Sequence, residues 1–185
     1  MEMIASVFSG SELKSEFPSL SNPELLWRSW AELESKPDSI WSDWLLAPGS
    51  LTQLLKEKSE NQFEVRVTSE EWTSFSSTGL RGLFGPLDDS HRFWSRKVIL
   101  RGKGEDWVMA HTLVPEHSLF SPLSKILKLK NKPLGEYLFS HPQLLRLSLE
   151  LSAVADDCWG RRSLFFLHGK PIMVAEFFLP QLVHS

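Results

Sequence analysis

One acidic residue stands inside an otherwise apolar stretch near the end of the chain. Glu176 is the only polar residue between Ile172 and Leu179, a run that reads as a strand covered on both faces. A carboxylate in that position loses its hydration, so it needs a cation, hydrogen-bond donors or a bound proton. Glu176 is therefore either a structural ion pair, a carboxylate that reaches water at the sheet edge, or a general acid or hydrogen-bonding group on the floor of a pocket.

A second charged residue has similar surroundings. Arg96 lies in the stretch 91–101, where it shares a strand face with Trp94, Val98 and Leu100. A guanidinium among apolar neighbours suits bidentate capture of a carboxylate. We predict that Arg96 is the counterpart of Glu176, either by binding an anionic ligand in the same site or by pairing with Glu176 directly.

Two predicted helix starts offer further groups for an anion. Ser50 to Gln53 matches the S-x-x-Q capping box, which predicts a helix from Ser50 to about Lys58. Pro133 opens another helix at its preferred first position. The first amides of a helix have no internal partner, so those of Leu51 and Leu134 are candidate donors to a carboxylate.

The elements that must position these groups predict an α+β fold. Six strands are expected, because apolar residues alternate with polar ones or run continuously between turn residues. A mainly antiparallel six-stranded sheet with helices packed on one side follows from the short or helical connections. The expected strands are about 63–67, 91–101, 107–114, 144–152, 162–168 and 172–179; the expected helices are about 22–33, 40–46, 50–58, 118–129 and from 133 onward.

The domain organisation is simple. The chain has 185 residues, which suffices for one core without metal or disulfide support. Residues 1–20 show weak periodicity and are expected to be poorly ordered or weakly packed, and residues 21–185 form the domain. The stretch 73–89 is rich in Ser, Gly and Pro, and it is either a mobile cover or contains a short element.

Composition and charge exclude several classes of protein. With 42% hydrophobic and 23% charged residues the chain has the composition of a soluble globular domain, and no run approaches the ~20 apolar residues that span a bilayer. Basic residues number 7 against 15 acidic ones through Asp89 and 13 against 8 after it, which favours a small anionic ligand in the second half. The basic residues form no stripe with exposed aromatics, so no nucleic-acid partner is expected.

The usual catalytic motifs are missing. The six His residues show no metal-ligand spacing, so no metal is expected, and there is no P-loop, GxGxxG or GxSxG motif. The single Cys158 is expected to be a small buried residue, and its lack of a partner fits a reducing cytoplasm. A buried acid, a well-placed Arg and helix-start amides remain, and together they suit the binding and reshaping of a small carboxylate.

Five segments stand out between about residues 43 and 180: RFWSRKVIL, WVMAHTLVP, KPLGEYLF, WGRRS and HGKPIMVAEFFLP. In this order and spacing they resemble the chorismate lyase family of ubiquinone biosynthesis, and the resemblance covers about residues 43–180. It implies a six-stranded antiparallel sheet with helices. It also implies conversion of chorismate to 4-hydroxybenzoate and pyruvate without a cofactor, by a cytoplasmic protein expected to be a monomer with no membrane span.

The resemblance also assigns roles to individual positions. Arg96 matches the arginine that binds the ring carboxylate, and Glu176 matches the acid at the 4-hydroxyl end, which would assist departure of the enolpyruvyl group if it is protonated. Leu134 and Leu51 match positions whose backbone amides hold the carboxylate, although Leu51 replaces Met. His111 stands where the family pattern has Arg. The helices that begin at Ser50 and Ser118 are the candidate lids.

Two other functions stay open at the level of sequence. Sensing domains of some transcription regulators resemble this fold, so the protein could bind a hydroxybenzoate-like acid without turning it over. The first 60 residues contain no recognisable helix-turn-helix, and both Arg96 and Glu176 are present, which favours the enzyme. An enzyme that yields a different hydroxybenzoate isomer would differ only in the shape of its pocket.

Overall fold

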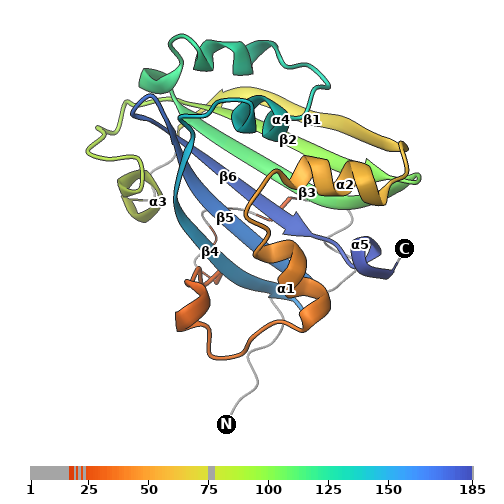
Figure 1. Ribbon diagram of the computed structural model, residues 1–185. Coiled ribbons are helices and arrows are strands. Elements are labelled where there is room, and N and C mark those ends of the chain that lie inside the picture. Colours follow the sequence, from red (N-terminus) through yellow and green to blue (C-terminus); the bar gives the residue numbers. More distant parts are fainter. Residues whose placement is uncertain (1–16, 19, 21, 23, 75–77, 185) are drawn as a thin grey trace.

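A six-stranded antiparallel sheet forms the centre of the molecule (Figure 1). The structure, a computed structural model, describes residues 17–18, 20, 22, 24–74 and 78–184. The strand order is β1-β2-β3-β6-β5-β4, and every neighbouring pair is antiparallel. The predicted α+β class and six strands are confirmed. The strands are β1 (Phe63–Thr73), β2 (Phe93–Gly102), β3 (Glu105–Pro115), β4 (Leu145–Ala155), β5 (Cys158–Leu167) and β6 (Lys170–Phe178).

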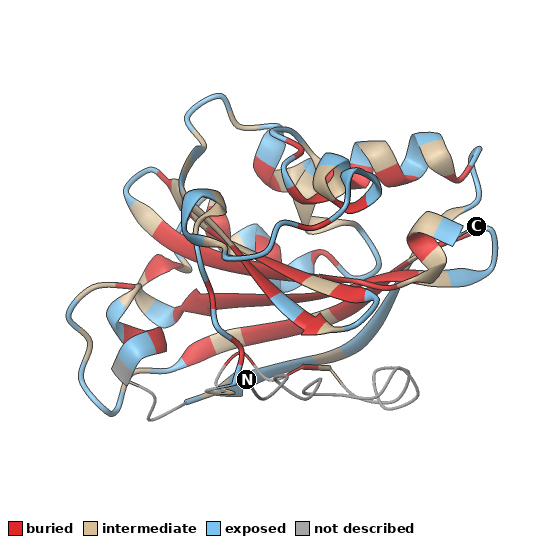
Figure 2. Cartoon of the chain, turned by 90° about the horizontal axis from the view of Figure 1, so that it is seen from below, coloured by how far each residue is buried: buried red, intermediate tan, exposed pale blue. Residues whose placement is uncertain are grey.

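The central strands are apolar because the sheet is covered on both faces. Strands β3 and β6 are buried along most of their length, whereas β1, at one edge, alternates with exposed residues. Figure 2 shows this contrast between the buried central strands and the exposed loops and helix surfaces. Strand β1 runs past the predicted end at Val67 to Thr73, beyond a bulge between Val67 and Ser69. This extension places Glu70 opposite Arg96.

Several of the predicted helices form close to their expected positions. The predicted helices near 40–46, 50–58 and after Pro133 correspond to the first, second and fourth α-helices, each within one or two residues. No described helix is long and apolar enough to cross a membrane. The α-helices are α1 (Ser39–Leu45), α2 (Leu51–Lys58), α3 (Thr78–Gly82), α4 (Leu134–Phe139) and α5 (Gln181–His184).

The predicted helix at 22–33 is wrong, as far as its residues are described. Arg28 forms an isolated bridge with Leu151, with backbone hydrogen bonds of 2.9 and 2.7 Å. Leu25 and Trp27 are buried while Leu26 is 55% exposed. Buried and exposed side chains therefore alternate, as they do in an extended chain. Only the short 3-10 turn η2 (Trp30–Glu32) follows. Pairing with β4 and burial of a large aromatic residue outweigh the helix-start signal here.

Two connecting segments also differ from expectation. The predicted helix at 118–129 is instead two 3-10 helices, η3 (Glu116–Ser118) and η4 (Leu123–Lys128). The stretch 73–89 contains α3, so its second reading, a loop with a short element, is confirmed where it is described. The predicted N-terminal segment lies almost wholly outside the described residues, and the boundary at residue 20 stays a prediction.

Helices lie on both faces of the sheet, which corrects the predicted one-sided arrangement. On one face α1 and α2 pack against Val98, Leu100 and Phe178, and α4 and η4 continue that layer. On the other face α3 and the segment around Trp27 cover Ile99 and Phe177. Successive strand residues point to opposite faces, so each apolar strand needs two covering layers.

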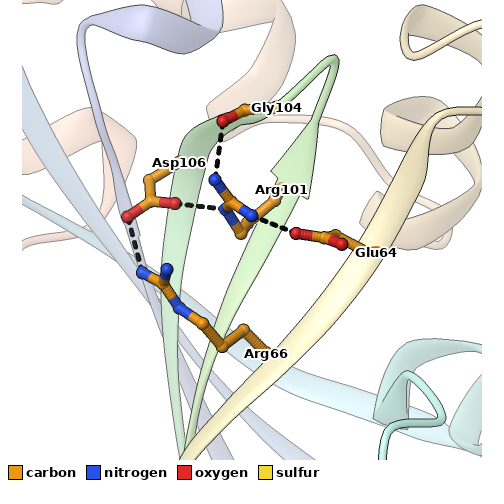
Figure 3. Close-up of polar contacts among 5 residues, drawn as sticks. All are labelled: Glu64, Arg66, Arg101, Gly104 and Asp106. Atoms are coloured by element: carbon orange, nitrogen blue, oxygen red, sulfur yellow. Dashed lines mark hydrogen bonds and ion pairs between the residues drawn. The ribbon is translucent and has the colours of Figure 1, made fainter.

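The end of the β2–β3 hairpin is held by exposed charges. Arg101 donates to Asp106 Oδ1 (2.5 Å) and to the Gly104 carbonyl (2.6 Å), and it also pairs with Glu64 (Figure 3). Arg66 reaches the same Asp106 at 2.8 Å. These hydrogen bonds raise the pKa of Arg101 above its usual value. Such networks at the rim fix the hairpin, but each exposed pair contributes only about 0.2–1 kcal/mol.

Candidate active site

A cavity lies between the sheet and the first turns of α2 and α4. All four residues predicted for the site, Arg96, Glu176, Leu51 and Leu134, line it, although they come from four separate elements. Its walls are otherwise mainly apolar. The full lining is Leu51, Thr52, Arg96, Val98, Leu100, Ala110, Thr112, Pro133, Leu134, Gly135, Leu138, Phe139, Arg146, Arg161, Phe165, Val174 and Glu176.

Arg96 is fixed in place by the loop before α4 and by β1. Its side chain is only 1% exposed. One terminal nitrogen pairs with Glu70, and the other donates to the carbonyls of Lys130 (2.6 Å) and Lys132 (3.2 Å). The Nε atom is buried and has no partner among the described residues. Because a buried donor without a partner is costly, this N–H is available for an anionic ligand.

Glu176 pairs with Arg161 and not with Arg96. Arg161 donates from Nε to Glu176 Oε2 at 2.7 Å, and its Nη2 lies 2.6 Å from the same oxygen. The hypothesis of a direct pair between Arg96 and Glu176 is therefore wrong, because each has a partner on an adjacent strand. Both Arg161 contacts go to one oxygen, so Oε1 has no hydrogen-bond donor among the residues that the structure describes.

Arg161 is a site residue that the sequence reading missed. Its Nη1 donates to the carbonyls of Trp44 (3.1 Å) and Leu45 (3.2 Å), at the C-terminal end of α1, where the helix dipole favours a cation. The sequence of the hairpin contained the information needed to predict the pairing of Arg161 with Glu176. The two-residue turn at His168–Gly169 pairs Leu167 with Lys170, and counting back along both strands brings Arg161 opposite Glu176.

The starts of α2 and α4 lie against each other at one end of the cavity (Figure 1). A Cβ added at Gly135 would come 2.7 Å from Thr52 Oγ1, so only glycine permits this approach. Leu51 and Leu134 are the first residues of their helices, which is where amides lack internal acceptors. The predicted capping box is wrong, since the Ser50 side chain makes no cap hydrogen bond and its Oγ has no partner in the described part of the chain.

Arg146 on β4 is a second residue that the reading missed. It was visible only as one of several polar residues alternating with leucines in that strand. Its guanidinium lies over the Phe165 ring at 4.9 Å from the centroid. Burial, and next the charge of Arg161, lower the pKa of Arg146 from its usual value. The cavity thus holds three arginines and one carboxylate, which makes it suitable for an anionic ligand.

His111 does not belong to this cavity. It lies on the opposite face of the sheet, where it is hydrogen-bonded with Ser95 (2.9 Å) and lines a separate depression with Lys97 and Leu113. Burial, with a smaller contribution from Lys97, lowers its pKa to about 4. The side chain is therefore neutral at pH 7. Because His111 faces away from the cavity, the substitution of His for the Arg of the family pattern does not weaken the positive charge of the cavity itself.

The remaining reactive groups of the described residues form no further centre beside the cavity. Cys158 is buried in the core of the opposite face, and burial raises the pKa of its thiol to about 12. No group of three or more His, Cys, Asp or Glu residues in the described ranges is arranged to hold a metal ion. The chemistry that the cavity itself offers is orientation and charge placement by guanidinium, carboxylate and amide groups.

Comparison with known proteins identifies relatives along most of the chain. The model of the chorismate lyase family matches residues 21–185. The chorismate pyruvate-lyase of Enterobacter sp. (strain 638) is 38% identical over 138 residues, which is 75% of this chain and 81% of that protein. The chorismate pyruvate-lyase of Serratia proteamaculans (strain 568) is 35% identical over 158 residues, 85% of this chain and 87% of its own length.

Among solved structures, the similarities are more distant. A transcriptional regulator of the GntR family from Bacillus cereus matches 65% of this chain and 93% of its own, with 10% identity and a TM-score of 0.47. The C-terminal domain of the histidine utilization repressor from Pseudomonas syringae pv. tomato str. DC3000 matches 66% and 94%, with 13% identity and the same TM-score. Scores at this level support no conclusion about this chain. The sequence relatives do, since both the family model and relatives above 30% identity span most of the chain, and the chain belongs to the chorismate lyase family.

Proposed function

We propose that this chain is a chorismate pyruvate-lyase that converts chorismate to 4-hydroxybenzoate and pyruvate without a metal or organic cofactor. The observation that carries the proposal is the meeting of Arg96, Glu176 and two helix starts in one apolar-walled cavity, in a chain of this family. The reaction would supply ubiquinone biosynthesis, of which it is the first committed step in the family. We expect a monomer in the cytoplasm whose partners are the substrate and the product, with no nucleic acid.

The reaction needs little covalent help from the protein. The bond between the ring and the enolpyruvyl oxygen breaks, the ring loses a proton from the carbon that bears the hydroxyl, and an aromatic ring forms. The departing enolpyruvate gains one proton at its methylene carbon and becomes pyruvate, so atoms and charge balance. Aromatisation drives the reaction, so the enzyme contributes mainly orientation, charge placement and exclusion of water. The cavity supports this role because most of its lining is apolar and its charged groups are held by hydrogen bonds.

At one end of the cavity we assign the ring carboxylate to Arg96. The unpartnered Nε–H of Arg96 is a donor of the required charge, and Glu70 and two carbonyls hold the guanidinium in position. Leu51 and Leu134 are the first residues of α2 and α4, and their backbone amides are further donors for the same carboxylate. A carboxylate there would accept hydrogen bonds from fixed donors that need no reorganisation during the reaction.

At the other end we assign the hydroxyl group to Glu176. Arg161 holds Oε2, and Oε1 is available to accept a hydrogen bond from the substrate. Because Glu176 is ion-paired, we give it the role of an acceptor that orients the ring, in place of the protonated acid expected from the sequence. Arg161 is then a positioning residue, since it acts on the substrate through Glu176.

The first experiment incubates purified protein with chorismate, separates the products by chromatography and assays pyruvate in parallel. We expect equal amounts of 4-hydroxybenzoate and pyruvate, and loss of both in Glu176→Ala. Glu150→Ala is the matched control, because Glu150 pairs with Arg162 on the neighbouring strands outside the cavity and its loss should leave turnover intact. Saturable binding of 4-hydroxybenzoate without turnover of chorismate would instead identify a sensor and overturn the proposal.

A further inference from the structure

Arg146 is the least compensated of the three arginines in the cavity. Arg96 pairs with Glu70 and two carbonyls, and Arg161 pairs with Glu176 and carbonyls beside α1. For Arg146 the only hydrogen bond among the described residues is a long one of 3.3 Å to the Ala47 carbonyl. Its Nε is buried without a partner. A partly buried cation with no salt bridge among the described residues is costly, so an anion in the cavity would stabilise it.

The neighbours of Arg146 indicate which end of the cavity an anion bound to it would occupy. Its Nη1 and that of Arg161 converge on the Ala47 carbonyl, at 3.3 and 3.5 Å. Arg146, Arg161 and Glu176 line the same cavity. Burial and next the positive charge of Arg161 lower the pKa of Arg146, while the negative charge of Glu176 raises it. The guanidinium is also steadied over two rings, Phe165 at 4.9 Å and Phe139 at 5.7 Å. The unpaired cation therefore belongs to the Glu176 end of the cavity.

We propose that Arg146 binds the second carboxylate of chorismate, the one on the enolpyruvyl group. This inference rests on the proposed function. Chorismate carries two carboxylates, and the cavity contains two guanidinium groups whose Nε atoms are buried and unpartnered, those of Arg96 and Arg146. The enolpyruvyl ether is attached to the ring carbon next to the one that bears the hydroxyl. With the hydroxyl at Glu176, the enolpyruvyl carboxylate comes to the Arg146 end.

The assignment gives Arg146 a role in telling substrate from product. The product 4-hydroxybenzoate has one carboxylate, which Arg96 binds, and it leaves Arg146 without a ligand once pyruvate departs. Arg146 therefore contributes to chorismate binding and to cleavage, and it contributes little to retention of 4-hydroxybenzoate. A residue that only shaped the pocket would affect both ligands alike.

The test measures chorismate kinetics and 4-hydroxybenzoate affinity in the same Arg146→Gln protein. Loss of one charged hydrogen-bonding partner predicts a fall in kcat/KM for chorismate of roughly 10- to 100-fold. The Kd for 4-hydroxybenzoate, measured by calorimetry, should change by less than about 3-fold. Retained product binding also reports that the pocket is folded. Arg162→Gln is the matched control, because Arg162 neighbours Arg161 on β5 but pairs with Glu150 outside the cavity.

Several outcomes would overturn the inference. Unchanged kcat/KM in Arg146→Gln, or an equal loss of both ligands, would remove Arg146 as the receptor for the second carboxylate. Arg146→Lys keeps the charge, so it should retain most chorismate affinity, and an equal loss of both ligands in that variant would also count against the inference.

The proposed function fails separately, if the wild-type protein does not turn chorismate over. In that case the same comparison is made on chorismate binding alone. Weaker chorismate binding with unchanged 4-hydroxybenzoate binding in Arg146→Gln would still support the inference, and absence of chorismate binding to the wild type would overturn it.

Discussion

Arg96 and His111 are buried polar residues on adjacent strands, and they lie on opposite faces of the sheet. Arg96 is 1% exposed and faces the cavity, where a carboxylate and two carbonyls hold it. His111 is 9% exposed, and its described hydrogen bonding is to Ser95 alone. The guanidinium on the cavity face is ion-paired, whereas burial, with a smaller contribution from Lys97, lowers the pKa of His111 on the other face to about 4.

The difference shows what a buried charge requires in this fold. On the cavity face, Arg96, Arg161 and Glu176 come from three strands and each has a partner that a different element supplies. On the opposite face, His111 shares its depression with apolar side chains, with Lys97, whose charge opposes protonation, and with Glu71, but it forms no ion pair among the described residues. Arg96, Arg161 and Glu176 are thus compensated by opposite charges and carbonyls, whereas burial of His111 disfavours its charged form.

The largest effect is expected from removing the cavity charge. Arg96→Ala should cost about 3–5 kcal/mol in kcat/KM for chorismate, because a substrate carboxylate would be buried without a cation. Steady-state kinetics measures this loss. Arg92→Ala is the control, since Arg92 lies just before β2 and forms an exposed pair with Glu116, so its loss should leave kcat/KM for chorismate unchanged. Unchanged turnover in Arg96→Ala would remove Arg96 from the site.

A smaller effect is expected on the free energy of unfolding when two neighbouring arginines of β5 are replaced in turn. Arg161→Leu leaves Glu176 buried without its cation, so the free energy of unfolding should fall by about 3 kcal/mol. Arg162→Leu breaks a more exposed pair with Glu150 and should cost about 1 kcal/mol. Urea denaturation measures both. Adding Glu176→Leu to Arg161→Leu should recover most of the loss, and a double variant no more stable than the single one would argue against an ion-pair cause.

The smallest effect concerns the pH dependence of stability that His111 causes on the face opposite the cavity. The folded-state pKa of His111 is about 4, below the ordinary histidine value of 6.5, so the unfolded chain takes up this proton first as the pH falls. His111 therefore destabilises the fold progressively from about pH 6.5 down to about pH 4, by about 2–3 kcal/mol. In His111→Gln this part of the acid sensitivity should disappear from denaturation curves recorded at pH 7 and pH 4. Identical pH dependence of stability in both proteins would mean that folding does not lower the pKa of His111.

The candidate site could be predicted in part from the sequence. Glu176 and Arg96 stood out because a charge in an apolar strand must have a reason, and that argument uses only neighbouring residues. Leu51 and Leu134 followed from helix-start signals that are local as well. The pairing of Arg161 with Glu176 was also within reach, because a two-residue turn fixes the register of the hairpin that contains them.

Other features depended on contacts between distant segments. Glu70 lies beyond the first predicted strand, which ends at Val67. In the structure β1 continues through a bulge and brings Glu70 beside Arg96. Arg146 reaches the cavity by way of β4, the edge strand, and only the carbonyl of Ala47 shows that it converges with Arg161. The segment around Trp27 lost its predicted helix to pairing with β4.

The sequence by itself determined the six strands, most of the α-helices and the two residues whose charge needs an explanation. Hydrophobic period and turn residues act over a few positions, so they are legible in one chain. Only the tertiary structure decided which charges pair, which face each strand residue occupies and which cavity arginine has no salt bridge among the described residues. These depend on strand order and on packing between elements far apart in the chain, where the energy of a buried charge is set by whatever the fold brings next to it.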